Sequence, residues 1–111
     1  MVENQIAVVT GASRGIGAAI AKALAGTGAS VIVNYQGSEE RAAAVVAEIR
    51  NSGNTAEAIQ CNVADYAACE AFFAEIIQKY GRIDILVNNA GITRDNLLLK
   101  MNTRLWLYHT Y

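Results

Sequence analysis

Three glycines near the start of the chain have the spacing of a phosphate-binding loop. Gly11, Gly15 and Gly17 fall in the segment TGASRGIG, residues 10–17, between an apolar run and a helical pattern. Glycine lets a backbone turn tightly and approach a ligand, and a helix N-terminus offers free N–H groups and a positive dipole to a pyrophosphate. The alternative is a plain glycine-rich turn between a strand and a helix. No Gly-Lys-Ser/Thr follows, so a mononucleotide-hydrolysing P-loop is disfavoured.

The elements around this loop alternate between short apolar runs and helical patterns, which is typical of a parallel α/β sheet. Strands are predicted at residues 6–9, 31–33, 55–60 and 83–87. The first is continuously apolar, as expected of a central strand covered on both faces, whereas the third is weakly apolar and is expected nearer an edge. A strand, loop and helix in this order is the context that a glycine-rich nucleotide motif requires.

Helical spacing of apolar residues predicts one helix after each of the first three strands. The buried stripe of the first is expected from Ile16, Ala19, Ile20, Ala23 and Leu24, before Gly26 and Gly28 end it. The buried face of the second is expected from Ala42, Val45, Val46 and Ile49. That of the third is expected from Phe73, Ile76, Ile77 and Tyr80. Ser38 and Asp65 are the predicted N-caps, and Gly81 is predicted to end the third helix.

Length and composition favour one globular domain whose partner is a small molecule or another protein. The 111 residues are 53% hydrophobic and 17% charged, with a formal net charge of -1. Scattered cations give no footprint for nucleic acid or an anionic membrane. No apolar run approaches the roughly 20 residues that cross a bilayer, and residues 1–5 are too short and polar to begin a secretory signal. We therefore expect a cytoplasmic protein.

The two cysteines carry no signal for redox or metal chemistry. Cys61 and Cys69 lack C-x-x-C spacing, and the sole histidine is His109, near the end of the chain. We expect both cysteines to be reduced thiols packed as small hydrophobic side chains, and we expect no metal site.

Two motifs together resemble the paired signature of the short-chain dehydrogenase/reductase family: Thr-Gly-x-x-x-Gly-x-Gly at residues 10–17 and Asn-Asn-Ala-Gly at residues 88–91. Within that family, residues 10–17, 33–35 and 88–98 are similar to the 3-oxoacyl-[acyl-carrier-protein] reductases. The resemblance implies a Rossmann-type three-layer α/β/α fold with a parallel sheet, truncated to its first four strands. Residues 1–101 would form an NADP-binding half-domain, and residues 102–111 a tail that diverges from the family pattern.

The resemblance also implies which residues bind the cofactor. Asn62 and Val63 would lie along the adenine, and Asn89, Ala90 and Gly91 would border the ribose and nicotinamide. For Asn62, a polar loop residue after an edge strand is the alternative. The full predicted set is Gly11, Ser13, Arg14, Gly15, Ile16, Gly17, Asn34, Tyr35, Asn62, Val63, Asn89, Ala90 and Gly91.

The end of the second strand indicates which nicotinamide cofactor is preferred. An NAD site typically places Asp or Glu about 20 residues beyond the glycine loop, to accept hydrogen bonds from the ribose 2′-OH. Here the strand ends on Asn34 and Tyr35. The absence of a carboxylate leaves room for Arg14 to pair with the 2′-phosphate of NADP(H), the predicted cofactor. A solvated loop cation is the alternative for Arg14, and Ser13 either hydrogen-bonds the same phosphate or braces the turn.

The catalytic residues that the resemblance implies are not found in this sequence. In the family, hydride from the nicotinamide reduces a carbonyl while a Tyr, with a Lys four residues on, donates the proton and a Ser polarises the oxygen. No Tyr here has Lys at that spacing. The resemblance thus implies an NADPH-dependent reductase of 3-oxoacyl thioesters on acyl carrier protein, in fatty acid biosynthesis, without turnover by this chain alone. A non-catalytic NADP-binding module, an association-competent fragment and a dehydrogenase of another alcohol stay open.

A sheet truncated after its fourth strand would leave that strand's backbone edge and the adjoining apolar faces open. We therefore expect self-association, or a homo-oligomer. Residues 102–111 are assigned no site of their own.

Overall fold

A computed structural model describes residues 5–89 and 107–110, which form one parallel sheet flanked by helices. In chain order the elements are β1 (Ile6–Thr10), α1 (Gly15–Gly26), β2 (Ser30–Tyr35), α2 (Glu39–Asn51), β3 (Ala56–Gln60), α3 (Tyr66–Tyr80), β4 (Ile85–Asn88) and β5 (Leu107–Thr110). The sheet order is β3-β2-β1-β4-β5, and every neighbouring pair is parallel. The Rossmann-type α/β class and its first four strands are confirmed, with β3 at an edge as predicted.

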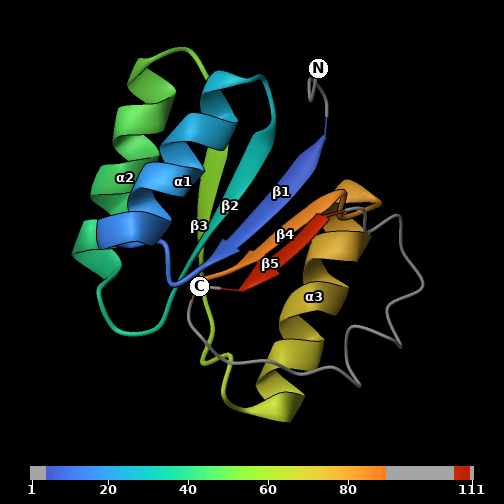
Figure 1. Cartoon of the computed structure of the whole chain (residues 1–111). Coiled ribbons are helices and arrows are strands. Elements are labelled where there is room, and N and C mark those ends of the chain that lie inside the picture. Colours follow the sequence, from blue (N-terminus) through green and yellow to red (C-terminus); the bar gives the residue numbers. More distant parts are fainter. Residues whose placement is uncertain (1–4, 90–106, 111) are drawn as a thin grey trace.

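The fifth strand was not predicted. β5 pairs with β4 in parallel register, from Ile85 opposite Leu107 to Asn88 opposite Thr110 (Figure 1). The expectation that the edge of β4 stays open is therefore wrong, because the tail strand pairs with the backbone groups that truncation was expected to leave exposed. This edge no longer supports the predicted self-association.

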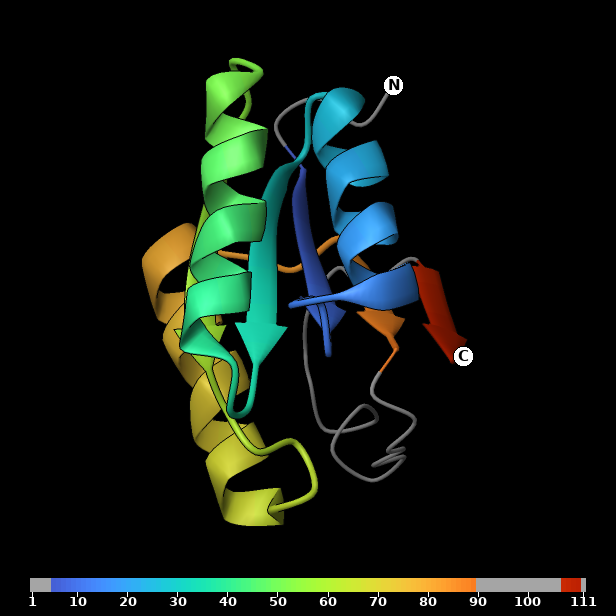
Figure 2. The same ribbon diagram turned by 90° about the vertical axis from the view of Figure 1, so that its left-hand side faces the viewer.

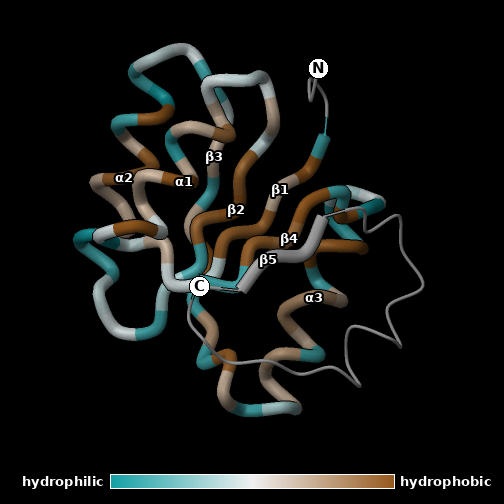
Figure 3. The backbone as a smooth tube through the Cα atoms, in the orientation of Figure 1, coloured by the Kyte–Doolittle hydropathy of each residue, from teal (hydrophilic) through white to brown (hydrophobic). Residues whose placement is uncertain are grey.

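The sheet is covered on both faces by helices. α1 and α2 lie on one face, which Figure 2 shows from the front, and α3 lies on the other. Because successive side chains of a strand point to opposite faces, Ala7 and Val9 join the core under α1 and α2, whereas Ile6 and Val8 join the core under α3. Figure 3 shows that the most hydrophobic segments run along β1, β2 and β4, between the two helical layers.

The prediction of the buried face of α1 is wrong, because the helix is rotated about its axis relative to the predicted orientation. Its buried residues are Gly17, Ala18, Ala21 and Ala25. Ile16 is 63% exposed, Ala19 and Ala23 are exposed, and Ile20 and Leu24 are partly buried. The sequence pattern gave weight to the largest apolar side chains, but the helix turns its smallest ones to the sheet. Small residues allow a close approach, which brings the start of α1 over the end of β1.

The other two helices largely match their predicted faces and ends. All four residues predicted for α2 are buried. In α3, Phe73 and Ile76 are buried as predicted, Ile77 and Tyr80 are partly buried, and Cys69 and Phe72 complete the buried face. Asp65 caps α3 by accepting a hydrogen bond from the N–H of Ala68 at 3.1 Å, and Gly81 ends it in a left-handed conformation. Ser38 precedes α2, but its side chain makes no capping hydrogen bond among the described residues.

Two further predictions concern the cysteines and the membrane. Cys61 and Cys69 are free and buried, as expected, and both lie in the core beneath α3. In the part of the chain that the structure describes, no helix has both the length and the apolar character needed to cross a membrane.

Candidate dinucleotide-binding site

The glycine loop lies at the carboxyl edge of the sheet, by which we mean the edge where β1, β2, β3 and β4 end. From β1 the chain crosses to β2 on one side, and after β3 it returns to form β4 on the other side of β1. This reversal creates a topological switch point at the end of β1. Ligands of open parallel sheets bind in the crevice outside such a point. The loop predicted to hold phosphate therefore lies where the topology places a ligand.

Gly11, the first residue of the loop, is held by asparagines from both flanking strands. Its N–H donates to Asn34 Oδ1 at 3.2 Å, and its carbonyl oxygen accepts from Asn89 Nδ2 at 2.9 Å. Its φ of 61° lies in the left-handed region that favours glycine. The next N–H, of Ala12, donates to the backbone oxygen of Asn34 at 2.9 Å. The course of the loop is thus fixed from outside, by β2 and by the end of β4.

Gly17 is required for a different reason, the close contact between α1 and this loop. A Cβ at Gly17 would lie 2.4 Å from the carbonyl oxygen of Gly11 and 2.5 Å from Asn89 Nδ2. Real Cβ atoms do not approach other atoms so closely. By contrast, a Cβ at Gly15 would meet nothing within 4 Å, and there the φ of 62° favours glycine. The glycine motif therefore serves both loop conformation and helix packing.

The N-terminus of α1 is suited to an anion. Arg14 is its N-cap, and its first turn contains no acidic residue. The first turn of α2, in contrast, carries Glu39 and Glu40, which compensate the positive end of that helix dipole. Arg14, Gly15 and Ile16 are exposed, and Ser13 is half-buried. A cation beside an uncompensated helix N-terminus is electrostatically unfavourable until an anion binds between them.

Asn34 and Tyr35 occupy different positions at the end of β2. Asn34 is 2% exposed, and its Nδ2 donates to the carbonyl oxygens of Ile59 and Cys61, each at 3.3 Å. Its side chain therefore braces the loop from within the protein. Tyr35 is half-buried, and its backbone oxygen accepts a hydrogen bond from the N–H of Cys61 at 2.9 Å. The ends of β2 and β3 are thereby joined beside the glycine loop.

The residues predicted to lie along the adenine follow β3 at the same edge. Val63 is buried, and Asn62 is half-buried. Asn62 Oδ1 accepts a hydrogen bond from the N–H of Ala64 at 3.0 Å, which is the contact expected of a turn-forming polar residue. Its role toward a ligand stays a prediction. Ala90 and Gly91 lie outside the described residues.

Sequence reasoning missed two polar contacts that join β1 to β4. Thr10 Oγ1 donates to Asn88 Oδ1 at 3.1 Å, beside the contact between Asn89 and Gly11. At the opposite end of β1, buried Asp84 accepts hydrogen bonds from the N–H of Ile6 at 2.8 Å and from Arg82 Nε at 2.7 Å. The only sequence signal for the first contact was the pair of asparagines directly after an apolar strand.

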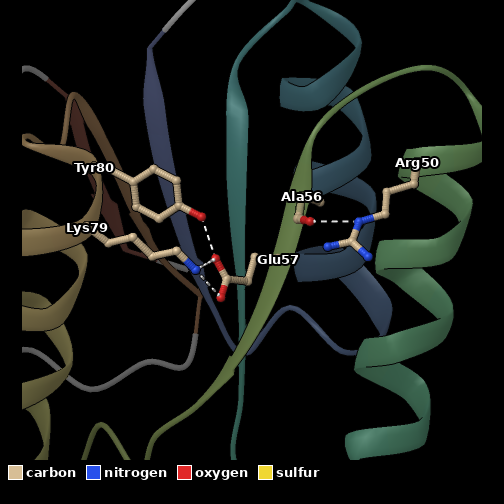
Figure 4. A network of polar contacts seen from close by, with 5 residues as sticks. All are labelled: Arg50, Ala56, Glu57, Lys79 and Tyr80. Carbon is tan, nitrogen blue, oxygen red and sulfur yellow. Dashed lines mark hydrogen bonds and ion pairs between the residues drawn. The ribbon is translucent and has the colours of Figure 1, made fainter.

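Glu57, Lys79 and Tyr80, which we call the Glu57 cluster, lie away from this edge. Lys79 Nζ lies 2.8 Å from both carboxylate oxygens of Glu57, and the Tyr80 hydroxyl donates to Glu57 (Figure 4). Hydrogen bonds from Lys79 and Tyr80 lower the pKa of Glu57. Burial, and then the hydrogen bond to Glu57, raises the pKa of Tyr80 to about 12. A tyrosine that transfers protons near neutral pH needs the opposite shift, so the raised pKa disfavours such a role for Tyr80.

Cys61 is also unsuited to chemistry. Burial, with a smaller contribution from the charge of Asp65, raises the pKa of its thiol. The thiolate is the nucleophilic form, so the raised pKa disfavours reaction of Cys61 as a nucleophile. Groups of three or more potential metal ligands are absent from the described residues.

Comparisons with known proteins agree with this architecture. A family model described as short chain dehydrogenase matches residues 5–108. The chain belongs to the short-chain dehydrogenase family.

Among curated relatives, 3-oxoacyl-[acyl-carrier-protein] reductase FabG of Staphylococcus aureus is 55% identical over 100 residues, which is 90% of this chain and 41% of the relative. The 3-oxoacyl-[acyl-carrier-protein] reductase of Synechocystis is 55% identical over 102 residues, covering 92% of this chain and 41% of the relative. The chain thus spans about two fifths of the length of these relatives.

Solved structures give the same result. A metagenomic short-chain oxidoreductase in complex with NADP superposes with a TM-score of 0.78 at 45% identity, covering 82% of this chain and 41% of that one. A short chain dehydrogenase from Burkholderia cenocepacia in complex with NADP has a TM-score of 0.76 at 52% identity, covering 84% and 38%. The likeness is therefore in sequence as well as in fold.

Proposed function

We propose that the carboxyl edge of this chain binds NADP(H). The observation that carries this proposal is the glycine loop held by Asn34 and Asn89 under the acid-free N-terminus of α1, with Arg14 exposed beside it. This arrangement presents backbone N–H groups and one permanent cation to a phosphorylated ligand. The NADP complexes of the two solved relatives support the choice of ligand.

NADP is proposed over NAD because the end of β2 has no carboxylate for a ribose 2′-OH. Tyr35 stands where the chain leaves the strand, and the side chain of Asn34 is turned inward. Arg14 is exposed and carries a planar guanidinium that can hold a phosphate through two parallel hydrogen bonds. We propose that Arg14 binds the 2′-phosphate, that Ser13 lies beside it, and that Asn62 and Val63 lie along the adenine.

The reaction that this site serves is proposed to be reduction of 3-oxoacyl thioesters on acyl carrier protein, in fatty acid biosynthesis in the cytoplasm. The names of the S. aureus and Synechocystis relatives support it. The residues of this chain would bind and orient the dinucleotide, and we propose that they do not include the proton donor that reduction of the substrate carbonyl needs. The isolated chain would then bind cofactor without turnover.

Calorimetric titration of the purified 111-residue chain with NADP and NAD tests this function, with circular dichroism to confirm folding. We expect NADP to bind at least about tenfold more tightly than NAD, since one charge-assisted phosphate contact is at stake. Equal affinities would contradict the proposed preference for NADP. A folded chain that binds neither dinucleotide would contradict the proposed function.

A further inference from the structure

The carboxamide of Asn34 joins three separate segments at the carboxyl edge. Its oxygen accepts from the N–H of Gly11 in the glycine loop, 23 residues earlier in the sequence. Its nitrogen donates to the carbonyl oxygens of Ile59, near the end of β3, and of Cys61, at the start of the segment toward α3. The side chain is almost fully buried. A buried amide with its donor and acceptor sides both satisfied is rigid, and it is costly to replace.

These contacts decide which backbone groups face a bound phosphate. The side chain and backbone oxygens of Asn34 take up the N–H groups of Gly11 and Ala12. Both N–H groups therefore point toward β2 and away from a ligand bound at the N-terminus of α1. The first-turn N–H groups of a helix have no partner within it, so those of α1, which begins at Gly15, can face an anion.

We infer that Asn34 is a positioning residue for the dinucleotide, which fixes the glycine loop relative to the segment carrying Asn62 and Val63 without touching the ligand. This inference rests on the proposed NADP function of the same edge. The pyrophosphate would bind at the loop and the adenine along the segment after β3, so the carboxamide sets the spacing between two parts of one site. Few side chains can replace it, because an acceptor must face Gly11 while a donor faces two carbonyl oxygens.

Two substitutions separate the two sides of the carboxamide. Asn34→Ala removes donor and acceptor. Asn34→Asp keeps an acceptor for Gly11 but places a carboxylate oxygen against the carbonyls of Ile59 and Cys61. The matched control is Asp84→Asn, which alters another buried polar contact to β1, at the far end of the strand. It should lower stability without reaching the glycine loop.

Amide hydrogen exchange of the ligand-free chain tests the brace without any cofactor. We expect the Gly11 N–H to be protected in the parent chain, to exchange about tenfold faster in Asn34→Ala, and to stay closer to the parent rate in Asn34→Asp. Asp84→Asn should leave the Gly11 rate unchanged relative to neighbouring amides. An unprotected Gly11 amide in the folded parent chain would overturn the inference, even if Asn34→Ala cannot be purified folded.

NADP titration under conditions where every variant is folded then tests the consequence for binding. We expect affinity to fall about tenfold in both Asn34 variants and not in Asp84→Asn. Unchanged affinity in Asn34→Ala with faster Gly11 exchange would overturn the positioning role. If the parent chain protects Gly11 but binds no NADP, the proposed function fails, and the exchange rates alone decide whether Asn34 braces the loop.

Discussion

The two faces of the sheet are built from side chains of different size. Under α1 and α2, eight of the sixteen described core residues are alanine. The core under α3 has no alanine among its fully buried residues and is filled by isoleucine, leucine, valine, cysteine and two phenylalanines, Phe72 and Phe73, whose rings meet edge to face at 5.0 Å. The small side chains under α1 and α2 thus allow these helices to approach the sheet closely, whereas large apolar side chains fill the space between α3 and the sheet.

This difference in side-chain size follows from how closely each helix must approach the sheet. α1 has to begin directly above the end of β1, so close that a Cβ at Gly17 would lie 2.4 Å from the carbonyl oxygen of Gly11. Large side chains between α1 and the sheet would lift the helix N-terminus from the loop. No such close contact is required of α3, whose face buries large apolar side chains, among them Phe72, Phe73 and Ile76. Substitutions on the two faces should therefore separate ligand binding from stability.

The largest effect on stability is expected from Phe73→Ala in the α3 core. Loss of a buried phenylalanine ring lowers the free energy of unfolding by about 3–5 kcal/mol. Urea denaturation measures this change, and Phe73→Leu provides a milder variant if the alanine variant does not fold. NADP affinity of the folded variant should match that of the parent chain. A large loss of NADP affinity in a fully folded Phe73 variant would contradict the claim that the α3 core affects stability and not ligand binding.

Gly17→Ala tests the opposite face. The new Cβ would collide with backbone and with Asn89, so we expect the free energy of unfolding to fall by about 2–3 kcal/mol and NADP affinity to fall about 100-fold. The control is Gly26→Ala on the same helix, where a Cβ meets nothing within 4 Å. Calorimetry and urea denaturation of both variants measure the two quantities. Parent-like NADP binding by Gly17→Ala would refute the close-approach argument.

Arg14→Ala sharpens the comparison at the level of one exposed charge. We expect NADP affinity to fall about tenfold, NAD affinity to stay unchanged and stability to change little, because Arg14 is exposed and its proposed partner, the 2′-phosphate, is present only in NADP. Lys22→Ala removes the same charge from an exposed position further along α1 and serves as control. A parallel loss of NADP and NAD affinity would show that Arg14 does not distinguish the two dinucleotides.

The smallest effect is expected from Glu57→Gln, far from the carboxyl edge. The lowered pKa of Glu57 contributes stability above its ordinary value of 4.5, and this is lost as pH falls through the lowered value. The raised pKa of Tyr80 contributes stability below 10, which is lost as pH rises toward about 12. Glu57→Gln should remove the acid limb, weaken the alkaline limb while burial of Tyr80 keeps part of it, and cost about 1 kcal/mol at neutral pH, since Lys79 is half exposed. Urea denaturation across pH measures this, and unchanged limbs would contradict it.

The sequence was informative where a local pattern dictates structure. Continuous apolar runs located β1 and β2, and the glycine spacing located the loop before α1. The rotation of α1 was missed because amphipathic patterns weigh large side chains, while the close contact at Gly17 selects small ones. The inward role of Asn34 and the pairing of β5 depend on residues distant in the sequence. No local pattern could reveal either.

The most direct test of the central claim is a titration of the isotope-labelled chain with NADP, followed by the chemical shifts of its backbone amides. We predict saturable shifts at residues 11–17 and at Asn62 and Val63, with none at Lys79 or Tyr80 in the Glu57 cluster. Such a map would place the dinucleotide at the carboxyl edge of the sheet. A folded chain whose glycine-loop amides do not respond to NADP would contradict the account.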